Sequence, residues 1–202
     1  MSTGEKPLLD AAIRSLELNG WDASQINESL LDAHASRSSL YHFYGSREGL
    51  LAAATAERYR RLLLQEDTAL VTEASDCETT EELLAFVTQQ LVRTVTDPDS
   101  IKARQSRVAI GADALIHEEL REEVAQKQQL FLDAIAEIIR EGQQKGIIRP
   151  ELNAMAYAVW MHGMLLGRTL TEAVFQDTAS WLEIAIEAVV APLRPRQTAP
   201  PK

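Results

Sequence analysis

Residues 24–50 constrain the fold of this chain more than any other stretch, because they place two short helical patterns on either side of a tight turn. The stretch reads SQINESLLDAHASRSSLYHFYGSREGL, and it begins with Ser24, whose hydroxyl can cap the first turn of a helix. Apolar residues then fall on one helical face until the letters DAHA interrupt the pattern. Ser36 begins a second helix, Gly45 ends it, and Ser46 caps a third. The stretch therefore predicts a helix-turn-helix unit.

The second of these helices has an unusual predicted exposed face. Leu40 and one of the aromatic residues Phe43 and Tyr44 are expected on its buried side. The opposite side carries hydroxyls, a guanidinium, a phenol and an imidazole, with no acidic residue among them. Such donors suit the major groove of double-stranded DNA, which admits a helix and offers base-edge acceptors and flanking phosphates. The predicted DNA-binding residues are Ser24, Ser36, Arg37, Ser38, Ser39, Tyr41, His42 and Arg47.

The ordered motifs around this unit resemble the N-terminal DNA-binding domain of TetR-family transcriptional regulators. They are the helix Leu8–Leu18, the Asn19-Gly20-Trp21 turn, Ser24-x-Ile26, Ser36-Arg37-x-Ser39-Leu40-Tyr41-x-x-Tyr44 and Ser46-Arg47-Glu48-x-Leu50. One departure is His34, which stands in the inter-helix turn where the family usually has glycine. The resemblance implies a dimeric regulator, more often a repressor than an activator, that binds a palindromic operator.

The rest of the chain predicts an all-α protein. It contains 9 glycines and 7 prolines in 202 residues, and it has no alternating β-branched run. Apolar residues recur at three and four positions instead. About nine helices are expected, over residues 8–18, 24–31, 36–43, 46–71, 80–96, 98–116, 117–146, 152–175 and 179–193. Thr80 is the expected N-cap of the fifth.

Three regions are predicted along the chain. Residues 1–50 form the helix-turn-helix domain, extended by the start of the connecting helix that follows. Residues 51–193 form a helical ligand-binding and dimerisation domain, and residues 194–202, which read RPRQTAPPK, form a disordered tail.

The net charge of −10 is unevenly distributed. Residues 1–65 carry seven Lys/Arg and eight Asp/Glu, whereas residues 66–202 carry thirteen and twenty-two, so the net charges are −1 and −9. The acidity therefore lies mainly outside the predicted DNA-binding domain. Because few cations reach the phosphates there, we expect modest intrinsic affinity and dimeric binding to two half-sites.

The last two helices are too apolar for one subunit to bury. Residues 152–175 are apolar almost all round, and the pair Gly163 and Gly167 would allow close helix approach. A self-complementary four-helix interface between two copies would cover them, as the resemblance also implies. The alternative is a larger core within one chain. The predicted dimer residues are Gly163, Gly167, Leu170, Val174, Trp181, Ile184 and Ala188.

A small-molecule effector is expected among the middle helices, if they resemble the regulatory domain of the family. An aromatic or amphipathic compound is predicted, although core packing alone would also explain each apolar candidate. Polar candidates, His162 among them, are more informative if they are buried, because a buried polar group without a partner is costly. The predicted effector-binding residues are Phe86, Gln90, Arg104, Arg107, Val108, Phe131, Ile135, Trp160, Met161 and Met164.

Enzymatic chemistry is not indicated by the sequence. The four histidines have no metal-ligand spacing, and no phosphate loop, nucleophile elbow or Cys-x-x-Cys motif is present, so no cofactor, metal or catalytic residue is expected. The single cysteine, Cys77, and the absence of an 18-residue apolar run predict a cytoplasmic protein without a membrane partner. A competing hypothesis is a helical ligand-binding or protein-interaction module that has lost DNA binding.

Overall fold

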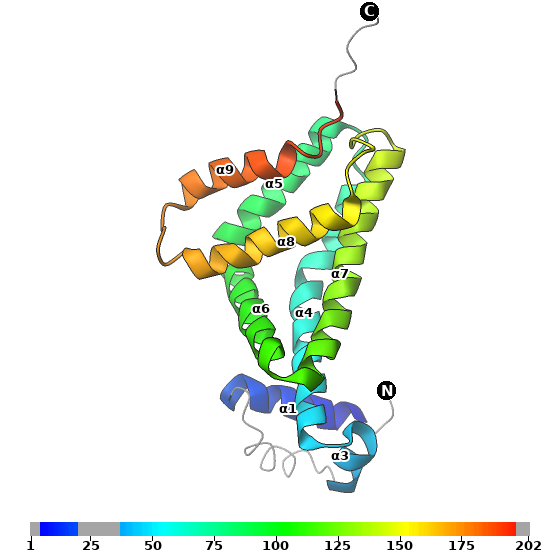
Figure 1. Cartoon of the computed structure of the whole chain (residues 1–202), viewed down its shortest axis with the longest axis vertical. Coiled ribbons are helices and arrows are strands. Elements are labelled where there is room, and N and C mark those ends of the chain that lie inside the picture. The colour runs from blue at the N-terminus through cyan, green and yellow to red at the C-terminus, as the bar shows by residue number, and fades with distance from the viewer. Residues whose placement is uncertain (1–4, 20–36, 197–202) are drawn as a thin grey trace, which may run out of the picture. The chain divides into compact units, whose positions relative to one another are not determined.

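The computed structural model describes residues 5–19 and 37–196, and within these ranges the chain is helical and has no strand. Figure 1 shows the arrangement of the helices. The all-α prediction is therefore confirmed. The helix predicted after Ser24, the turn residue His34 and the end of the predicted tail lie outside the described residues. The described helices are α1 (Glu5–Asn19), α3 (Arg37–Tyr44), α4 (Arg47–Ser75), α5 (Thr80–Thr96), α6 (Pro98–Ile116), α7 (Glu118–Gln144), α8 (Ala154–Thr171) and α9 (Thr178–Val190).

The prediction of Thr80 as the N-cap of α5 was wrong by one residue. The cap is Thr79, whose backbone is extended and whose Oγ1 accepts a hydrogen bond from the Glu82 N–H at 3.2 Å. The Glu82 carboxylate in turn accepts from the Thr79 N–H at 3.1 Å. This reciprocal pairing satisfies two donors that the first turn would otherwise leave unpaired.

The ends of α4 and α8 also differ from the sequence prediction. Helix α4 continues to Ser75, beyond the predicted end near residue 71. Helix α8 ends at Thr171 rather than at Phe175, and Asp177 then caps α9 by accepting a hydrogen bond from the Ser180 N–H at 3.0 Å. The cap starts α9 one residue earlier than predicted because an aspartate oxygen pairs the free N–H of the first turn.

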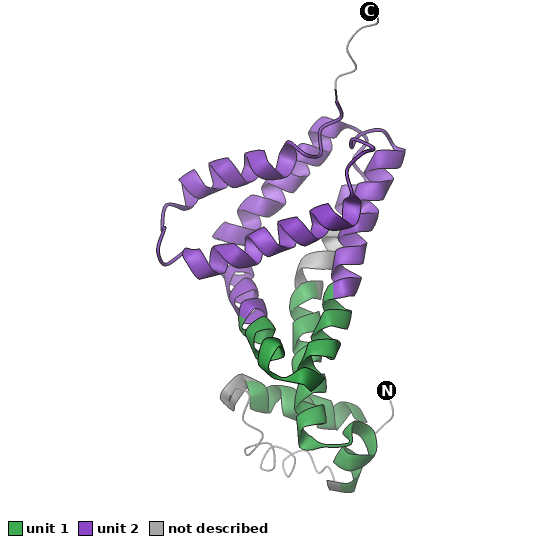
Figure 2. Cartoon of the chain, viewed as in Figure 1, with its two compact units in different colours: residues 1–63, 109–128 green, residues 64–108, 129–202 purple. Residues whose placement is uncertain are grey.

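The chain divides into two compact units, shown in Figure 2. Unit 1 comprises residues 1–63 and 109–128, and unit 2 comprises residues 64–108 and 129–202. Helices α4, α6 and α7 each contribute one segment to unit 1 and another to unit 2. The functional boundary predicted near residue 50 stays a prediction.

The core of unit 1 joins α1 to α3 and to the start of α4. The stripe of apolar residues predicted on α1 is buried, and Leu40 of α3 is inserted beside it. Leu50 and Leu51 supply the contribution of α4, with Tyr44 packed against the cluster. Burial of these apolar side chains holds α3 in one orientation. The polar face of α3 takes no part in this core. The cluster consists of Leu8, Leu9, Ala12, Ile13, Leu16, Leu40, Leu50, Leu51 and Ala54.

Unit 2 is held together by contacts that connect helix ends. The Tyr157 hydroxyl on α8 donates to the Val189 carbonyl on α9 at 2.7 Å. The Arg149 N–H donates to the Leu193 carbonyl at 3.1 Å, which ties the connection after α7 to the end of α9. Helix α9 also packs against α5. These bonds place α5, α7, α8 and α9 around a common interior.

The turn after α7 depends on Gly146, which has a φ of +75°. Both Ile147 and Ile148 donate backbone hydrogen bonds to the Gly142 carbonyl, at 2.9 and 3.1 Å. Helix α7 ends at Gln144, two residues before the end expected from the sequence, and the left-handed conformation of Gly146 lets the chain fold back. The fold-back buries both isoleucines.

Apolar side chains remain exposed on α8 and α9. Leu170, Val174 and Ile184 are 70%, 88% and 73% exposed, and Val159 and Trp160 are also exposed. No helix among the described residues is long and apolar enough to cross a membrane. These side chains therefore belong to a surface that this single chain leaves uncovered.

Candidate nucleic-acid interface and ligand cavity

The turn between α3 and α4 fixes the exposed face of α3. Gly45 has a φ of +70°, and its N–H donates to the Tyr41 carbonyl at 3.2 Å. Ser46 caps α4, because its Oγ accepts from the Gly49 N–H at 2.9 Å. A Cβ at Gly49 would lie 2.2 Å from the Tyr44 carbonyl oxygen, so only glycine allows this close approach. The predicted helix stop and cap are both confirmed.

Helix α3 separates apolar from polar side chains as predicted. Leu40 is buried, and Phe43 and Tyr44 are half-buried. Tyr41, at 57% exposed, and His42 point away from the core. Ser38 is also exposed, whereas Ser39 and Arg47 are half-buried. Ser24 and Ser36 lie outside the described residues, as does the side chain of Arg37.

The burial of Tyr44 has an electrostatic consequence. Desolvation, with a smaller contribution from the negative charge of Glu5, raises the pKa of the Tyr44 phenol to about 12. Its hydroxyl has no hydrogen-bond partner among the described residues. Tyr44 is therefore an uncharged packing residue of α3, while Tyr41, three residues before it, presents its phenol to solvent.

Two cations of α4 in unit 1 are paired with carboxylates. Arg60 donates from Nε to Glu57 at 2.7 Å, and Arg61 donates to Glu57 and, at 3.1 Å, to Asp10 of α1. Hydrogen bonds from Arg60, and then from Arg61, lower the pKa of Glu57 against the opposing effect of burial. These ion pairs link residues within α4 and join α4 to α1.

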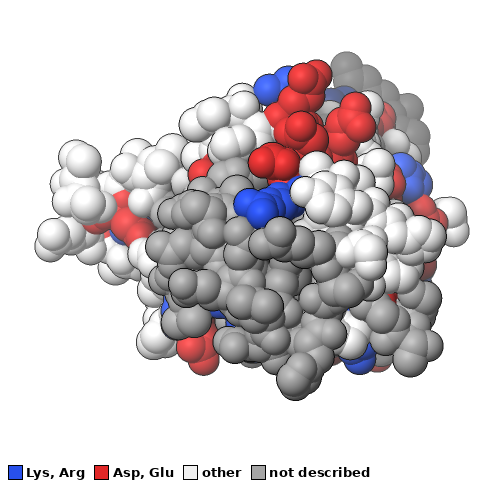
Figure 3. All heavy atoms as spheres, turned by 90° about the horizontal axis from the view of Figure 1, so that it is seen from below, with Lys and Arg blue, Asp and Glu red and all other residues white. Residues whose placement is uncertain are grey.

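Figure 3 views the molecule from below Figure 1, where α1 and α3 are drawn. Among the described residues on this face, acidic atoms gather in one cluster and basic atoms lie beside it and at separate places around it. A DNA contact here would depend on a few directed donors rather than on a strong positive field. This matches the near-neutral charge of residues 1–65.

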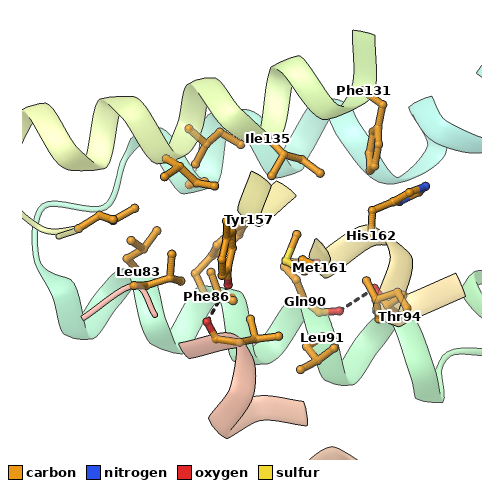
Figure 4. A pocket seen from close by; sticks show the side chains of 18 of the residues that line it. Leu83, Phe86, Gln90, Leu91, Thr94, Phe131, Ile135, Tyr157, Met161 and His162 are labelled. Atoms are coloured by element: carbon orange, nitrogen blue, oxygen red, sulfur yellow. Dashed lines mark hydrogen bonds between the residues drawn. The ribbon is translucent and has the colours of Figure 1, made fainter. Parts of the chain in front are cut away.

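A cavity of about 150 Å³ lies inside unit 2. Figure 4 shows α5 on one side and α7 on the other, with Tyr157 and Met161 of α8 between them and His162 beside Phe131 at one end. The lining is mostly aliphatic and aromatic. Its members are Ala74, Leu83, Phe86, Val87, Gln90, Leu91, Thr94, Arg107, Phe131, Ile135, Ile138, Ile139, Ile148, Tyr157, Met161, His162, Leu165, Val189 and Leu193.

Most of the predicted effector-binding residues lie at this cavity. The structure brings together Phe86, Gln90, Arg107, Phe131, Ile135 and Met161 in its lining. The remaining candidates lie elsewhere: Trp160 borders a separate shallow pocket, Arg104 is in an ion pair, and Val108 and Met164 are half-buried outside the lining.

Sequence reasoning missed several lining residues of α5. Leu83, Val87, Leu91 and Thr94 share the helical face of Phe86 and Gln90, at spacings of three and four residues. The complete stripe could have been read from that spacing. Tyr157 was missed as well, although it lies four residues before the predicted Met161 on α8 and so shares its helical face.

His162 is the most informative polar residue of the cavity. Its side chain is 4% exposed, its ring lies 5.2 Å from that of Phe131, and its Nε2 has no hydrogen-bond partner among the described residues. Burial, reinforced by the positive charge of Arg107, lowers the pKa of His162 to about 4. The imidazole is therefore neutral near pH 7.

Two further arginines are buried in unit 2. Arg104 is fully buried and donates from Nη2 to Glu172 at 2.9 Å, and Gln105 donates to the same carboxylate at 3.1 Å. Arg168 donates to the Phe175 carbonyl at 2.8 Å and lies 5.3 Å from the centre of the Trp181 ring. Among the described residues, no group of histidine, cysteine or acidic side chains could hold a metal ion.

The predicted dimer residues lie on α8, on α9 and in the connection between them. Leu170, Val174 and Ile184 are exposed, whereas Trp181 and Ala188 are half-buried. A Cβ at Gly163 or Gly167 would meet no atom within 4 Å, so neither glycine is required by packing inside this chain. The contact itself stays a prediction, because it concerns a second copy.

Comparison with known proteins identifies the N-terminal segment. Residues 8–54 match the model of the bacterial regulatory proteins of the tetR family. Among curated proteins, none matches the chain in sequence. The matched segment contains α1, α3 and the start of α4, together with Ser24, Ser36, Tyr41 and Arg47.

Solved structures share the fold over nearly the whole chain. A structure from Mesorhizobium loti MAFF303099 assigned to the TetR family has 20% identity and a TM-score of 0.65, covering 93% of each chain. The reduced form of Escherichia coli NemR has 15% identity and a TM-score of 0.62, covering 96% of this chain and 100% of its own. A regulator from Saccharomonospora viridis in complex with choline has 15% identity and a TM-score of 0.55, covering 94% of each.

The matched segment includes the polar face of α3, and the fold extends through the helices that enclose the cavity. The N-terminal segment is therefore similar to bacterial regulatory proteins of the tetR family, and the chain shares its fold with solved structures of that family.

Proposed function

We propose that the protein is a repressor that binds a palindromic operator as a homodimer and leaves it when a small molecule occupies the cavity of unit 2. The observation that carries this proposal is the mostly apolar cavity, at which a buried imidazole nitrogen has no hydrogen-bond partner among the described residues. A core that served packing alone would satisfy or avoid such a polar atom. The choline complex of the Saccharomonospora viridis regulator supports ligand binding by this fold.

Operator recognition would use the donors of α3. Tyr41 and His42 project from the helix, with Ser38 beside them, and Arg47 lies at the start of α4. Hydroxyl, phenol and imidazole groups can bond base edges or phosphates. Because the local charge is small, one copy would bind weakly, and two copies would engage half-sites separated by roughly 34–36 Å or a multiple of it.

Dimerisation would cover the exposed apolar side chains of α8 and α9. Leu170 and Ile184 project from these helices, and the open space above Gly163 and Gly167 leaves room for the close approach of a helix from a second copy. A two-fold interface brings the same surface of both copies together. The exposed apolar surface is what such an interface would remove from water.

Effector binding would act through helices that the two units share. Arg107 and Phe131 line the cavity in unit 2, and α6 and α7 continue from these positions into unit 1. A ligand releases DNA only if it prefers the conformation that fits the operator less well. A shift of α6 or α7 on ligand binding would supply such a second conformation.

The test is a gel shift of the full chain with DNA flanking its own gene, at two salt concentrations. We expect sequence-specific retardation that Tyr41→Ala and Arg37→Ala abolish and that unlabelled non-specific DNA does not compete away. Arg140→Ala is the matched control, because Arg140 is exposed and paired with Glu137 on α7. Absence of retardation at any salt concentration would support the competing module without DNA binding.

A further inference from the structure

The lining of the cavity in unit 2 carries little charge. Among the described residues that line it, none is an aspartate, a glutamate or a lysine, and Arg107 is the one arginine. Arg107 is 3% exposed and already takes part in an interaction within the chain. A charged ligand would lose its hydration in the cavity, and the lining offers it no carboxylate and no uncommitted cation in return. The lining therefore favours an uncharged ligand.

Two hydroxyl groups of the lining already donate hydrogen bonds inside the protein. The Tyr157 hydroxyl donates to the Val189 carbonyl at 2.7 Å, and the Thr94 hydroxyl donates to the Gln90 carbonyl at 2.8 Å. Figure 4 shows both bonds as dashed lines. Because each hydroxyl has a backbone acceptor, neither side chain requires a ligand to satisfy its donor.

His162 differs from these two residues, because its buried Nε2 has no hydrogen-bond partner among the described residues. Its ring lies at one end of the cavity, 5.2 Å from the ring of Phe131, and Leu83 lies at the opposite end (Figure 4). An aliphatic or phenyl side chain could fill this place without a polar atom that must be removed from water. Packing therefore explains the ring of His162 but not its nitrogen.

The protonation state of His162 limits the groups that can bond to it. Burial, reinforced by the positive charge of Arg107, lowers the pKa of His162 to about 4, so the imidazole is neutral near pH 7. In a neutral imidazole, Nε2 donates in one tautomer and accepts in the other. A carbonyl oxygen can only accept and an ammonium can only donate, whereas a hydroxyl can do both. A hydroxyl therefore pairs with His162 in either tautomer.

We propose that the effector is an uncharged monohydroxy compound, such as a monocyclic phenol, with its hydrocarbon body along the apolar lining and its hydroxyl beside His162. The cavity volume of about 150 Å³ suits a body of roughly the size of one benzene ring. Phe86, Ile135 and Met161 line the cavity between its two ends (Figure 4) and would contact that body. This assignment rests on the proposed regulatory function of the same cavity.

Isothermal titration of the full-length protein with para-cresol, toluene and para-toluate tests the assignment, because these probes share a methylbenzene body. We expect para-cresol to bind about tenfold more tightly than toluene, which would leave the His162 nitrogen without a partner. We expect para-toluate to bind at least about 100-fold more weakly than para-cresol, because its carboxylate would be desolvated without a counter-charge.

Two variants locate the source of the preference. His162→Phe should bind para-cresol and toluene with equal affinity. Thr88→Val is the matched control, because it removes a hydroxyl of α5 that donates to the Leu84 carbonyl and lies outside the cavity lining. The preference for para-cresol should be unchanged in Thr88→Val.

Equal affinity of para-cresol and toluene in the unmodified protein would overturn the assignment, and it is the result expected if a water molecule serves the His162 nitrogen. Tighter binding of para-toluate than of para-cresol, or absence of para-cresol binding at millimolar concentration, would overturn it as well. A preference for para-cresol that persists in His162→Phe would show that another group binds the hydroxyl. If His162→Phe fails to fold, the comparison of the three probes stands, and His162→Gln, which keeps a donor and an acceptor, should retain part of the preference.

Operator release is measured separately, in the gel shift with each probe added. If para-cresol binds with the expected preference but leaves the operator bound, the ligand assignment stands and the proposed release from the operator fails. If para-toluate or toluene releases the operator and para-cresol does not, the regulatory function stands and only the hydroxyl assignment fails.

Discussion

The polar residues of the two units are used in opposite ways. In unit 1, Tyr41 and His42 are exposed and lie outside the core that holds α3 in place. In unit 2, His162 and Arg104 are buried and have unpaired nitrogen atoms among the described residues. Removing a polar group from α3 should therefore change binding without changing stability, whereas removing one from the cavity should change both.

The largest expected effect comes from a substitution in unit 2 that changes DNA binding by unit 1 through loss of the dimer. Ile184→Glu places a carboxylate at the exposed apolar surface of α9, where two copies would meet. We expect the dimer to dissociate and operator affinity to fall about 100-fold, because like charges at an apolar interface are repelled and desolvated. Analytical ultracentrifugation and a DNA titration check this. If a monomeric Ile184→Glu protein kept full operator affinity, operator binding would not require dimerisation, and this part of the proposal would be wrong.

Acidification should destabilise the protein through His162. The folded-state pKa of His162 is about 4, against 6.5 for an ordinary histidine, so the unfolded chain takes up the proton first as the pH falls. Stability should therefore be lost between pH 6.5 and 4, by about 3 kcal/mol from this residue. Urea denaturation at a series of pH values measures the slope.

The control for this pH effect is His162→Phe, which should flatten the difference between pH 6.5 and 4. Carboxylates with lowered pKa values, such as Glu57 and Asp177, lose their stabilising effect at more acidic pH. This loss is the same in the unmodified protein and in His162→Phe. An identical slope in the variant would show that His162 is not held neutral by burial.

At pH 7, His162→Phe should stabilise unit 2. The substitution removes a buried nitrogen that has no hydrogen-bond partner among the described residues and places an apolar ring against Phe131, so the free energy of unfolding should rise by about 1–2 kcal/mol. Ligand binding should weaken in the same variant. A fall in stability at pH 7 would mean that His162 makes a stabilising contact.

Thr79→Ala should produce the smallest effect. It removes the hydroxyl that accepts from the Glu82 N–H at the start of α5, at a cost of about 1 kcal/mol. Thermal denaturation measures the loss, with Thr96→Ala as a control at the exposed end of the same helix. Since Thr79 lies outside the cavity lining, ligand affinity should be unchanged.

The sequence predicted unit 1 in more detail than unit 2, for physical reasons. The spacing of Leu40, Gly45 and Ser46 follows from local rules for helix faces, stops and caps, and the structure has each in its predicted role. The boundary between α8 and α9 was less predictable, because apolar residues continue to Phe175 and the α9 cap at Asp177 decides where the next helix starts.

The cavity could not be predicted from the spacing of residues within a single helix. The periodicity of α5 shows that Phe86 and Gln90 share a face, but it does not show whether that face meets packed side chains or a cavity. Trp160 and Arg104 were predicted beside the effector, and the structure places them outside the lining because each faces a different neighbour. Such differences depend on how α6, α8 and α9 pack in three dimensions.

One measurement tests the division of roles most directly: the affinity of the full chain for labelled DNA flanking its own gene, compared among the unmodified protein, Tyr41→Ala and His162→Phe. We expect Tyr41→Ala to lose sequence-specific binding while its melting temperature is unchanged, and His162→Phe to bind the ligand-free operator as the unmodified protein does. Unchanged operator affinity in Tyr41→Ala, together with its loss in His162→Phe, would contradict the assignment of DNA recognition to α3 and of ligand recognition to the cavity.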